Sequence, residues 1–381
     1  MRVQLRRTPA AGLGILLSVA AARGDFLETE DPSAAYLFRF FGDSEDVHVA
    51  SHFGAYETAI SASRLAVRWN HERVVVPAVD APPGSQDAVD AITTASRPIS
   101  GGGRDAFRDF TKVRNEVQAD LEFQGAALAY YVSSEEDYFA QQVKAQVQQP
   151  LFQQNLILSA GTSYGWDAID PLADDDTPGG SDTKTNLHGN VVATRVLGQT
   201  TVVRVGAELS RVDGLQHNPY RNVYAAGGPV PERHPDRRIR RDLFLKINQY
   251  LRNSSSLNVD YRFYADDWGI DSHTAGVKMN QYVSPDVVVS YRYRFYEQSR
   301  AGFQRDEYAE PTGIEGYLSG DYRMTAFTSH LFGSRLELNL GLLDRESRWL
   351  GGTRLTLSYE RYFNDDNFSA NVFESGLRFE F

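Results

Sequence analysis

Cysteine is absent from the 381 residues of this chain. Without thiols the chain cannot form disulfide bonds, thiolate metal sites, iron–sulfur clusters or covalently attached haem, and no cofactor is expected. The chain also has no surplus of positive charge. It contains 39 Lys and Arg residues and 50 Asp and Glu residues, so its net charge is −11. That balance argues against a nucleic-acid partner.

Long apolar runs are missing as well. Beyond the N-terminal segment, no run approaches the roughly 20 apolar residues that a membrane-spanning helix needs, and the mean hydropathy is −0.42. A helical membrane protein is therefore excluded. A transmembrane β-barrel is not excluded, because only alternate residues of its strands face lipid and its average hydropathy is low.

Apolar and polar residues alternate along most of the chain. In residues 113–123 and 257–264, an apolar residue occupies almost every second position, which is the pattern of a strand with two different faces. In a soluble sandwich the apolar face is the core, whereas in a membrane barrel it meets lipid and the polar face lines the lumen. The segments run for about 10–14 residues, longer than most soluble strands, and carry charges at mid-strand, which favours the barrel.

The predicted fold class is an all-β, transmembrane, antiparallel up-and-down β-barrel of about sixteen strands, with 14–18 as the range. The predicted strand spans are 34–41, 47–57, 61–75, 112–123, 126–133, 137–151, 155–166, 184–197, 200–212, 238–251, 255–265, 273–283, 287–297, 326–343, 353–363 and 368–381.

Short and long connections alternate along the chain. Tight turns such as residues 124–125 and 198–199 separate long connections such as 167–183 and 213–237. Single-chain membrane barrels have short periplasmic turns, longer external loops and an even number of strands. Residues 326–343 are predicted as one strand because splitting them would place the long loops on the same side as the termini.

The N-terminal segment has the three parts of a secretory signal peptide. Three arginines near the start supply positive charge, residues 10–19 are apolar, and residues 20–22 are alanines that offer a cleavage site. The sequence therefore predicts a signal peptide at 1–22, a short periplasmic segment at 23–33 and the barrel at 34–381.

The last predicted strand ends on an aromatic residue. Leu377, Phe379 and Phe381 alternate with Arg378 and Glu380. An amphipathic terminal strand that closes on Phe resembles the assembly signal of outer-membrane barrels. We therefore expect the three apolar residues to face lipid, the two charged residues to face the lumen, and the protein to lie in the outer membrane of a Gram-negative bacterium.

Five blocks of sequence stand out: Tyr261–Ile270 followed by Ser272-His273-Thr274, Asp90–Ser96 with Pro98, Tyr291–Arg294, Phe368–Val372 and Asn218–Arg221. Together they resemble an uncharacterised family of exported bacterial barrels, the domain of unknown function DUF3570, across nearly the whole mature chain. The external turn at residues 364–367 is shorter than the family leads us to expect. The resemblance implies an outer-membrane barrel, and it provides no substrate and no active site.

The polar faces of the predicted strands carry charges of both signs. These side chains are predicted either to line a channel whose transverse field selects small solutes or to form a salt-bridged network that fills the interior; a sixteen-stranded barrel has room for an aqueous channel. The lumen-lining candidates are Arg68, Arg114, Glu116, Asp120, Arg204, Glu208, Asp260, Arg262, Arg292, Arg294, Glu337 and Arg378.

Other clusters are weaker candidates. A basic run at residues 233–241 is predicted at the external mouth, where it could contact anionic lipopolysaccharide or attract anionic solutes. Asp174, Asp175 and Asp176 lie in one loop where carboxylates could bind Ca²⁺, but their spacing is not that of an EF-hand and no metal site is predicted. The eight histidines form no catalytic pattern, and the chain is not predicted to be an enzyme.

Aromatic residues gather near the predicted strand ends, as they do in the interfacial girdles of membrane barrels. The predicted external girdle contains Tyr164, Trp166, Tyr264, Trp268, Phe295, Tyr296, Tyr362 and Phe363. The predicted periplasmic girdle contains Phe152, Tyr250, Tyr282 and Phe381.

Taken together, these patterns predict a porin-like barrel that mediates the passage of small polar solutes. The alternative is a plugged barrel that acts as a scaffold or export component for a periplasmic or surface partner, and an outer-membrane hydrolase is a third hypothesis. The expected partners are outer-membrane lipid and lipopolysaccharide, the barrel-assembly machinery and small polar solutes.

Overall fold

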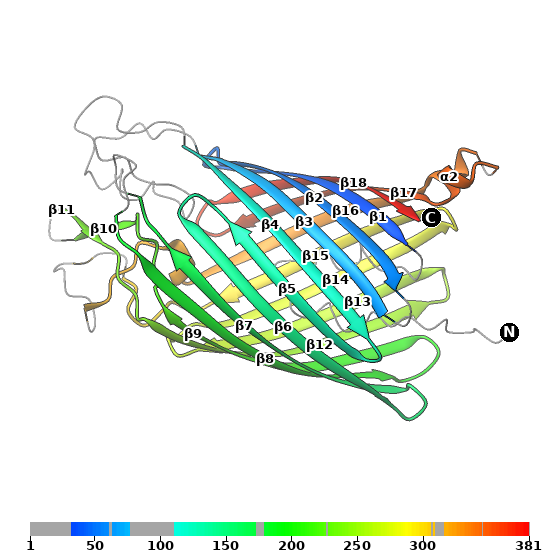
Figure 1. Ribbon diagram of the computed structural model, residues 1–381, viewed down its shortest axis with the longest axis horizontal. Coiled ribbons are helices and arrows are strands. Elements are labelled where there is room, and N and C mark those ends of the chain that lie inside the picture. Colours follow the sequence, from blue (N-terminus) through cyan, green and yellow to red (C-terminus); the bar gives the residue numbers. More distant parts are fainter. Residues whose placement is uncertain are drawn as a thin grey trace.

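Sixteen antiparallel strands close into a barrel whose strands tilt strongly against its axis (Figure 1). The computed structural model describes residues 32–60, 63–76, 110–172, 179–225, 228–305, 308, 316–344 and 346–380. The first strand closes the barrel by pairing with the last, from Ser33 opposite Glu380 to Asp43 opposite Ala370.

The barrel strands are 9 to 15 residues long, which suffices for a tilted strand to cross a bilayer. Their bounds are β1 (Ser33–Asp43), β2 (His48–Ile60), β3 (Ser63–Val76), β4 (Phe110–Phe123), β5 (Ala126–Ser134), β6 (Tyr138–Leu151), β7 (Leu156–Ile169), β8 (Asp182–Val196), β9 (Thr201–Gly214), β12 (Arg237–Leu251), β13 (Ser255–Asp266), β14 (Asp271–Ser284), β15 (Val287–Gln298), β16 (Phe327–Asn339), β17 (Thr353–Asn364) and β18 (Ser369–Glu380).

The two faces of each strand differ in chemistry. On β13, for example, Val259 and Tyr261 are exposed, whereas Asp260 and Arg262 lie on the opposite face. Each of the sixteen strands exposes at least one large apolar side chain in this way, and these side chains form a belt around the outside of the barrel. A soluble monomer rarely exposes apolar surface on this scale. The prediction of a transmembrane up-and-down barrel of sixteen strands is confirmed.

The strand predicted at 326–343 is shorter than expected. β16 ends at Asn339, whose side chain accepts a hydrogen bond from the backbone two residues on and turns the chain into the 3₁₀ helix η5 (Leu340–Leu342). The short helix α2 (Arg348–Gly351) follows, at the end of the barrel where β1 begins and β18 ends (Figure 1). The leucines of η5 continue the two-residue alternation of the strand, so the pattern alone overestimates its length. Within the described ranges, no helix is long and apolar enough to cross a membrane.

The predicted external girdle is partly wrong. Four of its residues occupy outward positions: Tyr164, Trp166, Phe295 and Phe363. Three occupy inward positions: Tyr264, Tyr296 and Tyr362. Trp268 is buried among the external loops. Nearness to a strand end does not specify a face, because side-chain direction alternates from one residue to the next. At the periplasmic end, three of the predicted aromatics are exposed: Phe152, Tyr250 and Tyr282.

Four predictions concern residues outside the described ranges: the signal peptide at 1–22, most of the segment at 23–33, the Asp174–Asp176 cluster and the terminal Phe381. On the described part of β18, Leu377 and Phe379 occupy outward positions.

Candidate functional site: the barrel interior and its external cap

The interior face of the barrel carries the charged residues that the sequence indicates. Each of the twelve occupies a position of opposite parity to the exposed apolar residues of its strand, so its side chain points inward. They are Arg68 on β3; Arg114, Glu116 and Asp120 on β4; Arg204 and Glu208 on β9; Asp260 and Arg262 on β13; Arg292 and Arg294 on β15; Glu337 on β16; and Arg378 on β18. A role in solute passage remains a prediction for all of them.

One ionic network joins β2, β3 and β4 across the interior face. Arg68 pairs with Asp120, and its Nη2 atom lies 3.5 Å from Glu57 Oε1. Arg64 pairs with the same glutamate. Glu57 was not predicted as a lumen residue, because apolar and polar residues hardly alternate along β2. Arg64, at the start of β3, was not predicted either, although it has the same parity as Arg68.

A second network joins β9, β12 and β13, and a separate hydrogen bond joins β8 to β9. Arg262 Nε donates to Asp242 Oδ1 at 2.5 Å, and its Nη2 atom lies 4.0 Å from Glu208 Oε2. Arg204 Nε donates to Thr194 Oγ1 at 3.2 Å. Asp242 was not predicted as a lumen residue; its partner Arg262 lies 20 residues further along the chain.

A third network crosses the seam between the first and last strands. Glu374 on β18 accepts hydrogen bonds from Arg39 Nε on β1 at 2.7 Å and from Ser358 Oγ on β17 at 2.9 Å. Arg335 Nη2 on β16 lies 3.8 Å from the same carboxylate. Charge-assisted hydrogen bonds are stronger than neutral ones, so Glu374 helps to hold the register in which the barrel closes.

The interior leaves space around its charges. The side chains of Arg114, Arg262 and Arg292 remain 37%, 35% and 33% exposed, although ion pairs hold each of them. Lys246 on β12 points inward and is also exposed. A close-packed interior would bury such groups. In the part of the chain that the structure describes, the barrel therefore encloses accessible polar walls.

Two glycines allow neighbouring side chains to lie flat against the wall. A Cβ atom at Gly276 on β14 would come within 2.6 Å of a carboxylate oxygen of Asp260 on the adjacent strand. A Cβ atom at Gly206 on β9 would come within 2.4 Å of the ring of Phe244 on β12. Asp260 and Phe244 thus lie over the neighbouring strand, close against the interior wall.

External loops pack into a cap at the end of the barrel opposite α2 (Figure 1). The cap consists of the described residues of three connections: 215–236, 267–270 and 299–326. It contains the hairpin of β10 (Asn222–Ala225) and β11 (Gly228–Pro231) and the 3₁₀ helix η4 (Tyr322–Met324). Two backbone hydrogen bonds between Arg233 and Leu318, of 3.0 and 2.9 Å, join the first and third connections.

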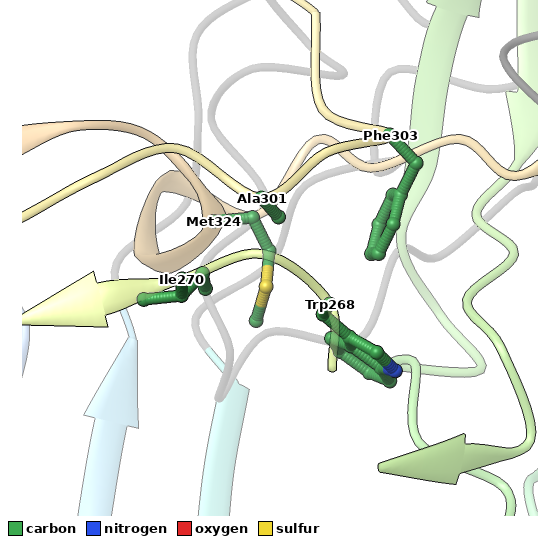
Figure 2. Close-up of a cluster of buried hydrophobic side chains, with 5 residues drawn as sticks. All are labelled: Trp268, Ile270, Ala301, Phe303 and Met324. Carbon is green, nitrogen blue, oxygen red and sulfur yellow. The ribbon is translucent and has the colours of Figure 1, made fainter. Parts of the chain in front are cut away.

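An apolar cluster joins the second and third connections of the cap (Figure 2). It consists of Trp268, Ile270, Ala301, Phe303 and Met324. The rings of Trp268 and Phe303 pack edge to face with centroids 5.3 Å apart, and Trp268 Nε1 donates to Arg237 O at 2.8 Å. Trp268 thus anchors the cap and does not belong to the lipid-facing girdle.

A buried polar cluster lies next to the apolar one. Ser319 Oγ donates to Glu232 Oε1 at 2.9 Å and lies 2.9 Å from His234 Nε2. Arg221 Nη1 lies 3.1 Å from Asp321 Oδ2 and 3.9 Å from Glu232 Oε2. All five side chains are buried. They tie the first connection of the cap to the third.

The serine, histidine and glutamate of this cluster are not arranged for nucleophilic catalysis. In a hydrolase triad the histidine lies between serine and acid and uses a different ring nitrogen for each. Here the same atom, His234 Nε2, lies 2.9 Å from Ser319 Oγ and 3.2 Å from Glu232 Oε1. Ser319 is also only 1% exposed. The arrangement suits stabilisation of the cap.

Burial disfavours the charged forms of Glu232 and Asp321, yet the pKa of each carboxyl is held below its ordinary value. His234 and Arg221 outweigh the burial of Glu232, and Arg323 and Arg221 outweigh that of Asp321. The ionised carboxylates therefore stabilise the cap fully above the ordinary pKa values of 4.5 and 3.8. This contribution is lost as the pH falls through the lowered values.

The arginines of the basic run at residues 233–241 lie in different places in the structure. Arg233 Nε donates to a backbone carbonyl of the third cap connection at 2.7 Å. Arg238 and Arg240 occupy inward positions of β12, where Arg238 pairs with Asp266 at 2.5 Å. Arg237 and Arg241 occupy outward positions of the same strand.

A polar Tyr–His pair occurs three times on the outer surface and was not predicted from the sequence. Tyr36, Tyr261 and Tyr293 each place the hydroxyl 2.6–2.9 Å from Nδ1 of a histidine on the neighbouring strand. The histidines are His52, His273 and His330. The pairs give hydrogen-bond partners to polar atoms on an apolar surface. A Tyr-x-Phe segment on one strand with a histidine on the next is the signal that would have revealed them.

No group of three or more His, Asp or Glu side chains within the described ranges is placed to hold a metal ion. The weak candidates Asp174, Asp175 and Asp176 lie outside those ranges.

Comparison with protein families gives one match. The family model described as "Protein of unknown function (DUF3570)" matches residues 177–372, slightly more than half of the chain. No curated protein matches the sequence.

Solved structures similar to this one include outer-membrane proteins of Pseudomonas aeruginosa. A mutant of the ferric enterobactin receptor PfeA gives a TM-score of 0.44 at 11% identity, over 88% of this chain and 54% of the receptor. The outer membrane protein OpdK gives a TM-score of 0.43 at 8% identity, over 92% of this chain and 99% of OpdK. The structure of OpdK with vanillate gives a TM-score of 0.38 at 9% identity, over 92% of this chain and 98% of OpdK. The chain spans about half the length of the receptor, and these likenesses concern the fold alone.

Proposed function

This chain belongs to the DUF3570 family of proteins of unknown function, and from that premise and the geometry of the barrel we propose that it mediates the passage of small polar solutes across the outer membrane. The observation that supports this proposal is the accessible, charged interior wall, represented by Arg114, Arg262, Arg292 and Lys246. Sixteen-stranded barrels are wide enough to hold an aqueous channel.

Opposite walls of the interior carry different charges. On β4 the inward side chains include Glu116, Asp120 and Glu122 but also Lys112 and Arg114, so three carboxylates outnumber two cations there. In the closed order of strands, β14 lies eight strands from β4 in either direction, and it carries Lys278. The strand next to it contributes Arg292, which is the register partner of Lys278. A polar solute between these walls would experience a transverse field that orients it.

Replacing Lys246 by Glu should make the channel more cation-selective. Lys246 faces the lumen and is exposed, so a negative charge at this position would attract cations and repel anions. We expect the cation-to-anion permeability ratio to rise by about two- to fivefold. The measurement is the reversal potential of single channels in a planar bilayer under a salt gradient.

Arg73→Glu is the matched control, because Arg73 is exposed on an outward position of β3 and the change in charge is the same. It should leave the reversal potential unchanged. If the reversal potential of the Lys246 variant is unchanged, or if the control shifts equally, Lys246 does not line the conduction path.

The packed cap favours a second candidate function, in which the barrel is a scaffold or export component for a partner. Its apolar cluster and its buried Glu232–His234–Ser319 cluster give the external end a defined surface. A folded barrel that binds a partner without conducting ions would support this function. A conducting barrel would support the first.

The proposal also places the protein in the outer membrane of a Gram-negative bacterium. Lipid and lipopolysaccharide would surround the apolar belt, and the barrel-assembly machinery would insert the chain. The C-terminal strand, with Leu377 and Phe379 on outward positions, supports this assignment.

A further inference from the structure

Three arginines gather on the outer surface of two paired strands. Arg237 and Arg241 occupy outward positions near the external end of β12, and Arg211 occupies an outward position near the external end of β9. The register places Arg237 opposite Asp213 and Arg241 opposite Leu209. The three guanidinium groups therefore belong to one patch, which we call the rim arginines.

The rim arginines carry more positive charge than their surroundings neutralise. Asp213 accepts a hydrogen bond from Arg211 Nε at 2.6 Å and one from Arg237 Nε at 3.2 Å. Within the described ranges, no ion pair involves Arg241, and its side chain is exposed. A second exposed carboxylate, that of Asp267, accepts a hydrogen bond at 2.8 Å from the backbone N–H of Ile239, which lies between Arg237 and Arg241. Three positive charges thus face two carboxylates, and the patch keeps a surplus of one.

The patch lies at the edge of the apolar belt. Leu209 and Leu243 are exposed on the same outer surface. Leu209 lies level with Arg241, and Leu243 lies on the periplasmic side of all three arginines. The external halves of the other described strands carry only two outward-facing arginines, Arg73 on β3 and Arg361 on β17. The concentration of three on β9 and β12 is therefore local and does not belong to a uniform basic ring.

We propose that the rim arginines bind the phosphorylated headgroup of an outer-leaflet glycolipid, an inference that rests on the proposed outer-membrane location. Guanidinium groups bind phosphate oxygens in pairs through a planar fork, and the exposed guanidinium of Arg241, which no ion pair in the described part of the chain holds, offers such a fork to a phosphate. The acyl chains of the same lipid would pack on Leu209 and Leu243. The combination of cationic and apolar surface selects a lipid over a free anion.

The test uses the full-length barrel in detergent and bisphosphorylated lipid A as the probe, with retention measured by native mass spectrometry. The variant Arg211→Gln/Arg237→Gln/Arg241→Gln should bind lipid A about tenfold more weakly than the wild type. The matched control removes three outward arginines elsewhere, as Arg73→Gln/Arg195→Gln/Arg361→Gln, and should stay within about twofold of the wild type. Heat-modifiable migration on gels confirms that each variant is folded.

The substitution Asp213→Asn should change lipid A binding in the opposite direction. Removing this one of the two neighbouring carboxylates should strengthen lipid A binding several-fold, and the variant retains every arginine. Equal weakening in the two triple variants would overturn the proposal, because binding would then follow total charge. Displacement of lipid A by inorganic phosphate at similar concentrations would also overturn it, since the patch would be a simple anion site.

Discussion

Val259→Arg should destabilise the folded barrel in a bilayer by about 2–4 kcal/mol and hinder its assembly. Val259 lies near the middle of β13, points outward and is 43% exposed. Its register partners are Ile247 on β12 and Val277 on β14, so apolar side chains surround it. An arginine at this depth would place its charge in hydrocarbon, far from either headgroup layer. The measurement is the free energy of unfolding in urea from phosphatidylcholine vesicles, followed by heat-modifiable gel migration.

Asn258→Arg is the matched control for this prediction. Asn258 precedes Val259 on the same strand and points inward, opposite Asn248 and Lys278. An arginine on a wet interior wall should cost less than about 1 kcal/mol. Equal destabilisation by the two substitutions would contradict the assignment of the outer face to lipid.

Arg221→Met should lower the local stability of the cap by about 3–5 kcal/mol, the usual cost of removing one partner from a buried ion pair. Arg221 Nη1 lies 3.1 Å from Asp321 and 3.9 Å from Glu232, and all three side chains are buried. Methionine is apolar, so both carboxylates would lose this cation without gaining water. Hydrogen exchange at the backbone amides of residues 318–321 is the measurement, and exchange there should accelerate strongly.

Arg233→Met is the companion variant in the same loop. Arg233 is exposed and donates one hydrogen bond to a backbone carbonyl, so its loss should cost about 1 kcal/mol or less. The amides of the barrel strands should keep their protection in both variants. Loss of protection throughout the barrel would show that the cap is not a separately stabilised unit.

The barrel could be predicted from the sequence because each strand is indicated by the alternation of neighbouring residues. In β4 and β13 every second residue faces lipid, and the predicted spans 112–123 and 255–265 differ from the observed ones by at most two residues. The inward direction of the charged candidates follows from the same alternation. Where the alternation misleads, as through the leucines of η5, the predicted strand is too long.

The cap and the ionic networks could not be predicted in this way, because their partners are distant in sequence. Ser319 and Glu232 are 87 residues apart, and Arg39 and Glu374 are 335 residues apart. Loops have no periodicity, so nothing in the sequence indicates which of them meet. For the same reason, the sequence does not show that Arg211 lies beside the basic run on β12, whereas the strand register does.

The central claim is that this barrel encloses a continuous aqueous path. Single-channel recording of the purified, heat-modifiable protein in a planar lipid bilayer tests that claim most directly. The accessible charged walls predict discrete, reproducible steps of ionic conductance on insertion. Correctly folded protein that inserts into the bilayer and produces no conductance above that of the bare membrane would contradict the claim.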